Sequence, residues 1–279
     1  MTKKKTTTTT SLTTTSELRQ RCIRHFAMLG IPLREHELEA VLHTVEENAL
    51  SHLAFLDLLI SNLVRQRRER STERRIRAAK FAKRKLLEDF DWNFNRKAFD
   101  RVQIQQLASG DFIRRRANLI LVGQSGIGKS HIIQAIGMKA CALGFRVLYR
   151  TSAELITDLT ASLADKSLPQ RLRKYKNPDL LIIDEFGFDR IERLECPEAV
   201  HLLYKVIASR NQQRSTALVT NVDFDRWGDY LADGPLAMAF LDRLVEGAII
   251  LKLKGRSYRA SKTSNKNSTS RPSNTKSQP

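Results

Sequence analysis

The feature that most constrains this chain is one short run, GQSGIGKS, at residues 123–130. A short apolar segment from Asn118 to Val122 precedes it, as expected for a buried parallel strand, and Ser130 to Leu143 has the pattern of a helix. A glycine-rich turn between a strand and a helix lets backbone N–H groups surround a phosphate. The run therefore predicts a P-loop that holds ATP, with Lys129 at the β- and γ-phosphates and Ser130 at Mg²⁺. The residues expected to bind the nucleotide are Gly123, Gln124, Ser125, Gly126, Ile127, Gly128, Lys129, Ser130 and His131.

Two acidic residues follow a second apolar segment. Leu180 to Ile183 is typical of a central strand, and Asp184 and Glu185 come directly after it. Open α/β sheets bind their ligands at the carboxyl ends of the strands. We expect Asp184 to bind Mg²⁺, directly or through water, and Glu185 to activate a water molecule against the γ-phosphate. The alternative, a strand followed by a capping residue and a solvated acid, is disfavoured by the P-loop upstream.

Two further polar residues occupy positions where a nucleotide-hydrolysing site uses them. Asn221 follows the apolar strand that ends at Thr220, and there it can sense the γ-phosphate and fix the water, although an ordinary turn residue is the alternative. Arg243 precedes the last predicted strand. It is either an ordinary surface arginine or an arginine finger that acts on a neighbouring subunit.

Strands and helices alternate from residue 117 onward, which indicates an α/β fold. We expect a P-loop core with a parallel sheet flanked by helices, preceded by a small all-helical N-terminal domain. Residues 16–29 and a longer stretch around 38–64 carry the helical spacing of apolar side chains. The expected divisions are a disordered tail at 1–15, a helical domain at 16–87, a connector at 88–116, the nucleotide-binding domain at 117–259 and a disordered Ser/Thr/Asn-rich tail at 260–279.

The net charge of +18 lies mostly outside the predicted core. Residues 117–255 have a net charge of +2, whereas Arg65 to Lys85 contains 11 basic residues and two acidic ones. The stretch is predicted to be helical, and a solvated helix face with internal ion pairs is the alternative to a surface that contacts DNA phosphates. Two acidic residues cannot neutralise 11 basic ones, so we favour a surface that contacts DNA phosphates. The expected DNA-binding residues are Arg65, Arg67, Arg68, Arg74, Arg75, Arg77, Lys80, Lys83, Arg84 and Lys85.

The remaining composition favours a cytoplasmic protein. The three cysteines are far apart and form no CxxC pair, which fits a reducing compartment and argues against a zinc finger. No apolar run approaches the roughly 18 residues that span a bilayer, so no membrane partner is expected. Met1 to Thr15 lacks the apolar segment of a secretory signal.

Five motifs taken together resemble the AAA+ ATPases of the DnaC/IstB group, and IstB-like transposition helper ATPases most of all. The resemblance covers roughly residues 35–259, and the aromatic run at 90–94 is also similar to the start of that family's ATPase core. The combination of GKSH, TNxxFxxW and GxSYR is much more specific than the P-loop. The motifs are GQSGIGKSH at 123–131, LLIIDEFG at 180–187, TNVDFDRW at 220–227, FLDRL at 240–244 and GRSYR at 255–259.

The resemblance implies an ATP-dependent homo-oligomer on double-stranded DNA that works with a transposase. Lys129 and Ser130 match the Walker A pair of the family, and Asp184 and Glu185 match Walker B. Asn221 matches sensor 1, and Arg243 matches the arginine finger that acts across a subunit interface.

Two other functions remain as alternatives. The first is a DnaC-type replicative helicase loader, which would share the whole nucleotide site and differ in its N-terminal surface; the basic stretch favours DNA over a docked helicase. The second is a structural DNA-binding protein with a vestigial nucleotide fold. Four intact site residues argue against it, namely Lys129, Ser130, Asp184 and Glu185.

Overall fold

The computed structural model describes residues 14–187, 198–231 and 233–258. The expected tails at 1–15 and 260–279 therefore lie outside the described residues, apart from residues 14 and 15. The chain divides into two compact units after Ser71, inside helix α3 (His52–Ala79), and each unit is described by itself. In the described part of the chain, no helix is long and apolar enough to cross a membrane.

The first unit is helical. Helix α1 (Thr15–Met28) begins at a capping box in which Thr14 and Glu17 satisfy each other's backbone N–H groups. Helix α2 (Glu35–Glu47) and the first part of α3 follow, and buried leucines and a valine pack between these helices: Leu33, Leu38, Val41 and Leu59. The helical stretch predicted around 38–64 is thus two helices, because Ala49 takes a left-handed φ of 46° and Ser51 caps the start of α3.

The second unit is built on a five-stranded parallel sheet, which confirms the predicted α/β class. Its strand order is β2-β3-β4-β1-β5, and every adjacent pair is parallel. Each strand is short, and all but β5 are buried along almost their whole length, as expected for a sheet that is covered on both faces. The strands are β1 (Leu119–Gly123), β2 (Val147–Thr151), β3 (Leu180–Phe186), β4 (Ser215–Thr220) and β5 (Ile249–Leu253).

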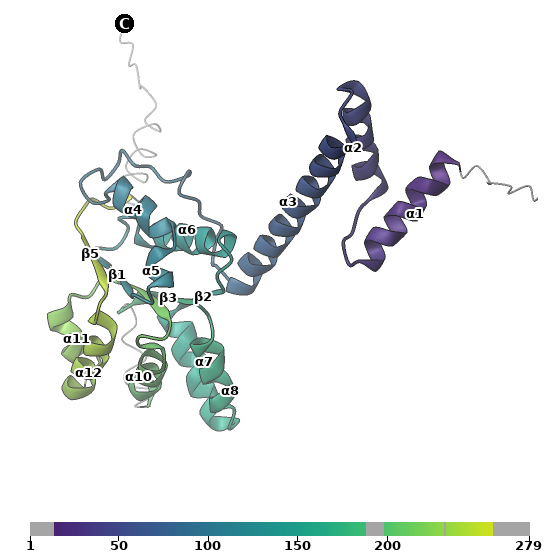
Figure 1. Ribbon diagram of the computed structural model, residues 1–279. Helices are drawn as coiled ribbons and strands as arrows, with labels where there is room; N and C mark the ends of the chain where they lie inside the picture. The colour runs from purple at the N-terminus through teal and green to yellow at the C-terminus, as the bar shows by residue number, and fades with distance from the viewer. Residues whose placement is uncertain (1–13, 188–197, 232, 259–279) are drawn as a thin grey trace, which may run out of the picture. The chain divides into compact units, whose positions relative to one another are not determined.

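Alternate residues of the strands enter two separate apolar cores. Leu119 and Leu121 point to the face covered by α4 (Arg101–Ala108) and α6 (Lys129–Ala142), with the short α5 (Asp111–Arg114) beside them. Ile120 and Val122 point to the other face, where Figure 1 shows α7, α8, α10 and α12. The elements of that face are α7 (Ser152–Ala164), α8 (Leu168–Lys176), α10 (Ala199–Arg210), η1 (Phe224–Arg226), α11 (Trp227–Leu231) and α12 (Gly234–Val245).

The strand order brings the predicted site residues together. Strands β1 and β4 are neighbours, and β3 lies on the other side of β4. Because all strands are parallel, the loops after β1, β3 and β4 leave the sheet at one edge. The P-loop, the Asp-Glu pair and Asn221 therefore share that edge.

The basic helix ends earlier than predicted. Helix α3 stops at Ala79, Lys80 takes a left-handed φ of 58°, and Lys83 to Lys85 are not helical. The reason is tertiary: Phe81 packs into the core beside Gly137 of α6, and the Lys83 backbone N–H donates to Gln134 Oε1 at 3.2 Å. These contacts outweigh the helical preference of the alanines around position 80.

Residues 88–116, predicted to be a connector, contain α4 and α5. Helix α4 begins at Asp100, whose side chain accepts hydrogen bonds from the backbone of Val102 and Gln103. Its buried Ile104 and Leu107 belong to the core beneath α6. This stretch therefore packs as part of the second unit.

Candidate nucleotide-binding site

The loop between β1 and α6 has a backbone that requires glycine at two positions. Gly126 has a φ of 82°, and a Cβ there would lie 2.2 Å from Ser257 Oγ. Gly128 has a φ of 112°, and a Cβ there would lie 2.8 Å from the Phe90 ring. The loop then leads directly into the N-terminus of α6, which is the arrangement that binds phosphates.

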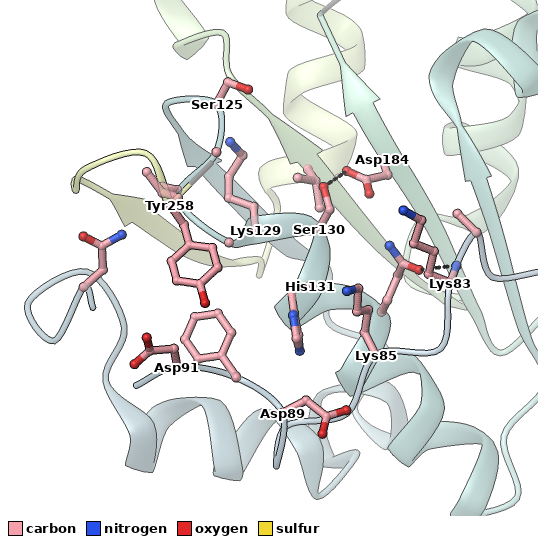
Figure 2. A pocket seen from close by; sticks show the side chains of 18 of the residues that line it. Lys83, Lys85, Asp89, Asp91, Ser125, Lys129, Ser130, His131, Asp184 and Tyr258 are labelled. Carbon is pink, nitrogen blue, oxygen red and sulfur yellow. Dashed lines mark hydrogen bonds between the residues drawn. The ribbon is translucent and has the colours of Figure 1, made fainter. Parts of the chain in front are cut away.

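Lys129 lies in the first turn of α6 with its ammonium turned back onto the loop. The residue is only 5% exposed, and Nζ donates to the carbonyl oxygens of Gly123 and Gln124 at 2.6 and 2.8 Å. A buried ammonium at a loop of backbone N–H groups is a strong local positive charge. An anion that enters the loop therefore meets a cation already held beside it (Figure 2).

Asp184 is buried at the end of β3 and directed toward α6. Its Oδ1 accepts hydrogen bonds from Ser130 Oγ at 3.1 Å and from the backbone N–H of Glu185 at 2.8 Å (Figure 2). Its Oδ2 accepts from the hydroxyl of Tyr149 at 2.8 Å. The strand end and the helix start are thus joined through one carboxylate.

Ser130 and Asp184 fit a magnesium ion. Mg²⁺ is usually bound by one or two protein oxygens together with substrate phosphates and water, and a hydroxyl beside a carboxylate supplies such oxygens. Among the described residues, no group of three or more His, Cys, Asp or Glu side chains is arranged to hold a metal ion. The pair therefore suits an ion that arrives with a nucleotide better than a closed structural metal site.

Glu185 has a backbone conformation that is rare for a residue with a side chain. Its φ is 59°, and the register between β3 and β4 shifts between Ile183 and Phe186. Such a bulge changes the direction in which neighbouring side chains point. Asp184 is buried while Glu185 is exposed in the same cavity. A left-handed non-glycine residue costs of order 1–3 kcal/mol, and such strain is found most often at functional sites.

A cavity of about 550 Å³ opens beside these residues. The predicted residues that line it, by sequence position, are Ser125, Gly126, Ile127, Gly128, Lys129, Ser130, His131, Asp184 and Glu185. Gly123 and Gln124 contribute through the carbonyl oxygens that Lys129 binds. Ile127 is 2% exposed, and its side chain belongs to the core that contains Ile104 and Leu107.

The far wall of the cavity is aromatic, and the sequence predicted no role in nucleotide binding for Phe90, Phe94 or Tyr258. Phe90 packs edge-to-face against His131, and Phe94 packs edge-to-face against Tyr258. Asn95 holds the two distant segments together, because its side chain both donates to and accepts from the backbone of Arg256. The sequence signals were the aromatic run at 90–94 and the GRSYR motif at 255–259, both of which the family resemblance included.

His131 contacts this wall rather than the P-loop. Its Nε2 lies 2.8 Å from the carbonyl oxygen of Leu86, and its ring packs against Phe90. The side chain still lines the cavity. It therefore connects the start of α6 to the chain segment that follows the basic stretch.

Asn221 and Arg243 do not line this cavity. Asn221 is exposed directly after β4, and its Oδ1 lies close to Gly187 at the end of β3. Arg243 is exposed in the last turn of α12, and its carbonyl oxygen lies near the side chain of Asn118, which precedes β1. Arg243 is thus at the opposite edge of the sheet from the P-loop, separated by the length of β1, roughly 15 Å.

The predicted DNA-binding residues differ in their surroundings. Most are exposed, whether on α3 or directly after it: Arg65, Arg67, Arg68, Arg74, Arg77, Lys80, Lys83 and Arg84. Arg75 is half-buried and donates to the carbonyl oxygen of Cys141 at 2.7 Å, and Arg77 and Arg84 both bind Glu73. Lys83 and Lys85 line the nucleotide cavity. The basic stretch is therefore not one uniform surface.

A parallel sheet with a P-loop after one strand and an Asp-Glu pair two strands away defines a P-loop nucleotide-binding protein. Comparison with known families identifies the branch. The family model of the IstB-like ATP binding protein matches residues 27–266, and the chain belongs to this family. The resemblance that the motifs indicated is confirmed.

Individual relatives agree with this assignment. The ATP-binding protein of insertion sequence IS5376 from Geobacillus stearothermophilus is 31% identical over 242 residues, which cover 87% of this chain and 94% of the relative. The ATP-binding protein of insertion sequence IS21 from Pseudomonas aeruginosa is 32% identical over 224 residues, 80% of this chain and 83% of the relative. Among solved structures, DnaI has a TM-score of 0.51 at 20% identity, covering 61% of this chain and 92% of DnaI. This likeness shows the fold.

Proposed function

We propose that the protein hydrolyses ATP with Mg²⁺ in the cavity between the P-loop and β3. The observation that carries the proposal is the buried carboxylate of Asp184 bonded to the first-turn hydroxyl of α6, with Glu185 turned outward beside it. An acid that holds a metal ion and a second acid that can accept a proton are the two groups that this chemistry requires. Both lie in one cavity with Lys129.

Each residue of the site has a separate role in the proposed hydrolysis. The P-loop backbone and Lys129 bind the phosphates and stabilise the charge that develops on them. Ser130 and Asp184 hold Mg²⁺, which when bound neutralises phosphate charge. Glu185 orients the attacking water and accepts its proton, and Asn221, at the same sheet edge, fixes that water or senses the γ-phosphate.

Arg243 acts in a homo-oligomer in this proposal. It lies at the opposite sheet edge from its own P-loop, so it serves the site of a neighbouring subunit. Arginine suits the role because its planar guanidinium remains charged and binds two phosphate oxygens at once. Such a residue is worth roughly 10³–10⁵ in rate.

The proposed partners are double-stranded DNA and a transposase. The exposed arginines of α3 supply a surface for phosphates, and the protein's charge of +18 attracts polyanions. The relatives named above belong to insertion sequences, which are mobile elements, and this supports a role in DNA transposition and recombination. The likeness to DnaI supports the fold alone, so we favour a transposase over a replicative helicase as the client.

The test is ATP turnover by the wild-type protein and Glu185→Gln, each with and without duplex DNA. The amide preserves the shape of the side chain but cannot accept a proton, so we expect nucleotide binding without turnover. We expect duplex DNA to stimulate the wild-type rate. Turnover by Glu185→Gln at the wild-type rate would contradict the assignment of Glu185, and a wild-type protein that binds no ATP would contradict the proposal as a whole.

A further inference from the structure

Tyr149 is a buried tyrosine whose hydroxyl reaches the candidate metal-binding carboxylate. It lies on β2, where Arg150 and Thr151 pair with Ile183 and Asp184 of β3. The residue is 4% exposed, and its hydroxyl donates to Asp184 Oδ2 at 2.8 Å. It also lines the nucleotide cavity. No sequence motif marks this position.

The bond to Tyr149 complements the other bonds of the carboxylate. Ser130 and the Glu185 backbone both donate to Oδ1, whereas Tyr149 donates to Oδ2. Donors on both oxygens fix the rotation of a carboxylate, because turning it would break at least one bond. The Tyr149 hydroxyl is the donor of its bond, because a carboxylate oxygen accepts.

The tyrosine ring is itself held in place. Phe81, which follows α3, packs against it with ring centroids 6.0 Å apart. Phe81 fits there because Gly137 has no side chain; a Cβ at that position would lie 2.8 Å from both the Phe81 ring and Ile182. The packing of the ring thus holds the hydroxyl beside Asp184.

We propose that Tyr149 is a positioning residue that orients Asp184 so that Asp184 and Ser130 together bind the magnesium ion of the nucleotide. The inference rests on the proposed function, because it concerns the same site. Hydrogen-bonding partners of metal ligands commonly change metal affinity about 10–100-fold when they are removed. In this assignment Tyr149 acts on the metal ligand Asp184, so removing its hydroxyl should change the binding of the metal and not that of the nucleotide alone.

The experiment measures the affinity of a fluorescent ATP analogue, first in EDTA and then across a Mg²⁺ series. Tyr149→Phe removes one oxygen and leaves the ring in place. We expect its affinity in EDTA to equal that of the wild type within twofold, and its Mg²⁺ half-saturation concentration to rise about 10-fold. Binding is read directly, so the result does not depend on turnover.

Tyr175→Phe is the matched control. Tyr175 is also fully buried, and its hydroxyl also donates to a carboxylate, that of Asp158, but on α8 and away from the cavity. Both variants should lose stability to a similar extent, because each removes one buried hydrogen bond to an acid. Only Tyr149→Phe should raise the Mg²⁺ concentration needed for half-saturation.

Three outcomes would contradict the inference. If the Mg²⁺ half-saturation concentration of Tyr149→Phe is within twofold of the wild-type value, Tyr149 does not position the metal ligand. If Tyr149→Phe and Tyr175→Phe raise that concentration equally, the effect is one of stability. If Tyr149→Phe loses affinity in EDTA as well, the residue supports the pocket in general. A wild-type protein with no Mg²⁺-dependent binding would instead contradict the proposed function itself.

Discussion

Lys129 is a buried cation held against the P-loop. Its Nζ binds the carbonyl oxygens of Gly123 and Gln124, and the residue is 5% exposed. An ammonium held there is placed to bind the phosphates of a nucleotide that enters the loop.

Lys129→Ala should therefore weaken ATP binding strongly. A hydrogen bond to a charged group is worth about 1.5–3 kcal/mol, which corresponds to roughly a 10–100-fold loss of affinity. Calorimetric titration with ATP measures this loss of affinity. Lys139→Ala is the control on the same helix, because Lys139 makes only an exposed ion pair with Glu88. Equal affinities for the wild type and Lys129→Ala would show that the P-loop is not the phosphate site.

Among the helices and strands, the parallel strands were predictable from the sequence, whereas the end of helix α3 was not. Buried parallel strands are continuous apolar runs, and the run ending at Ile183 is visible in the sequence alone. The end of α3 at Ala79 was not, because it depends on Phe81 packing beside Gly137, more than 50 residues away. Helical propensity describes neighbours in sequence and not such contacts.

The parts of the site that were predicted lie in local sequence motifs, and the parts that were missed depend on contacts between distant segments. The P-loop and the Asp-Glu pair are contiguous motifs, so their residue types and spacing predict a shared sheet edge. Tyr149 reaches Asp184 only because β2 pairs with β3, and Tyr258 meets Phe94 only because the chain returns after β5. Pairing between strands and segments far apart in the sequence cannot be read from local pattern.

One half-buried carboxylate joins the amino ends of three strands. Asp179, directly before β3, accepts hydrogen bonds from the backbone and side chain of Arg146 and from the side chain of Arg214. Burial raises the pKa of Asp179, but the bonds and charges of the two arginines outweigh it and lower the pKa overall. The ionised carboxylate is therefore favoured by folding.

Asp179→Asn should cost about 1–3 kcal/mol of unfolding free energy at pH 7. Because the folded pKa is lowered, this stability is present above the unfolded pKa of about 3.9 and is lost as the pH falls through the lower folded value. The difference from the wild type should therefore shrink below about pH 4. Urea denaturation at several pH values measures it. The exposed Asp111→Asn is the control, with a change of at most about 0.5 kcal/mol, and a difference that is independent of pH would contradict the account.

At the scale of the whole molecule, the charge and the nucleotide site belong to different parts of the sequence. Residues 117–255 are close to neutral, whereas Arg65 to Lys85 has 11 basic residues. Within that stretch, Arg67, Arg68 and Arg74 are exposed, Arg75 bonds to a carbonyl of α6, and Lys83 lines the nucleotide cavity. We propose that the exposed arginines contact DNA and that the lysines at the end of the stretch serve the ATP site.

On this proposal, the protein binds DNA through the exposed arginines Arg67, Arg68 and Arg74. The most direct test is the affinity for duplex DNA by fluorescence anisotropy, in the presence of ATP, over a range of salt concentrations. The wild-type protein should bind less tightly as salt rises, with a linear decrease of log K against log salt. Replacing Arg67, Arg68 and Arg74 with Ala should lower the affinity and reduce that slope by up to about 3, since each phosphate contact contributes about 0.9. Arg75→Ala, which removes a bond inside the protein, should leave the slope unchanged. A wild-type complex that is insensitive to salt, or a triple variant with the wild-type slope, would contradict the claim.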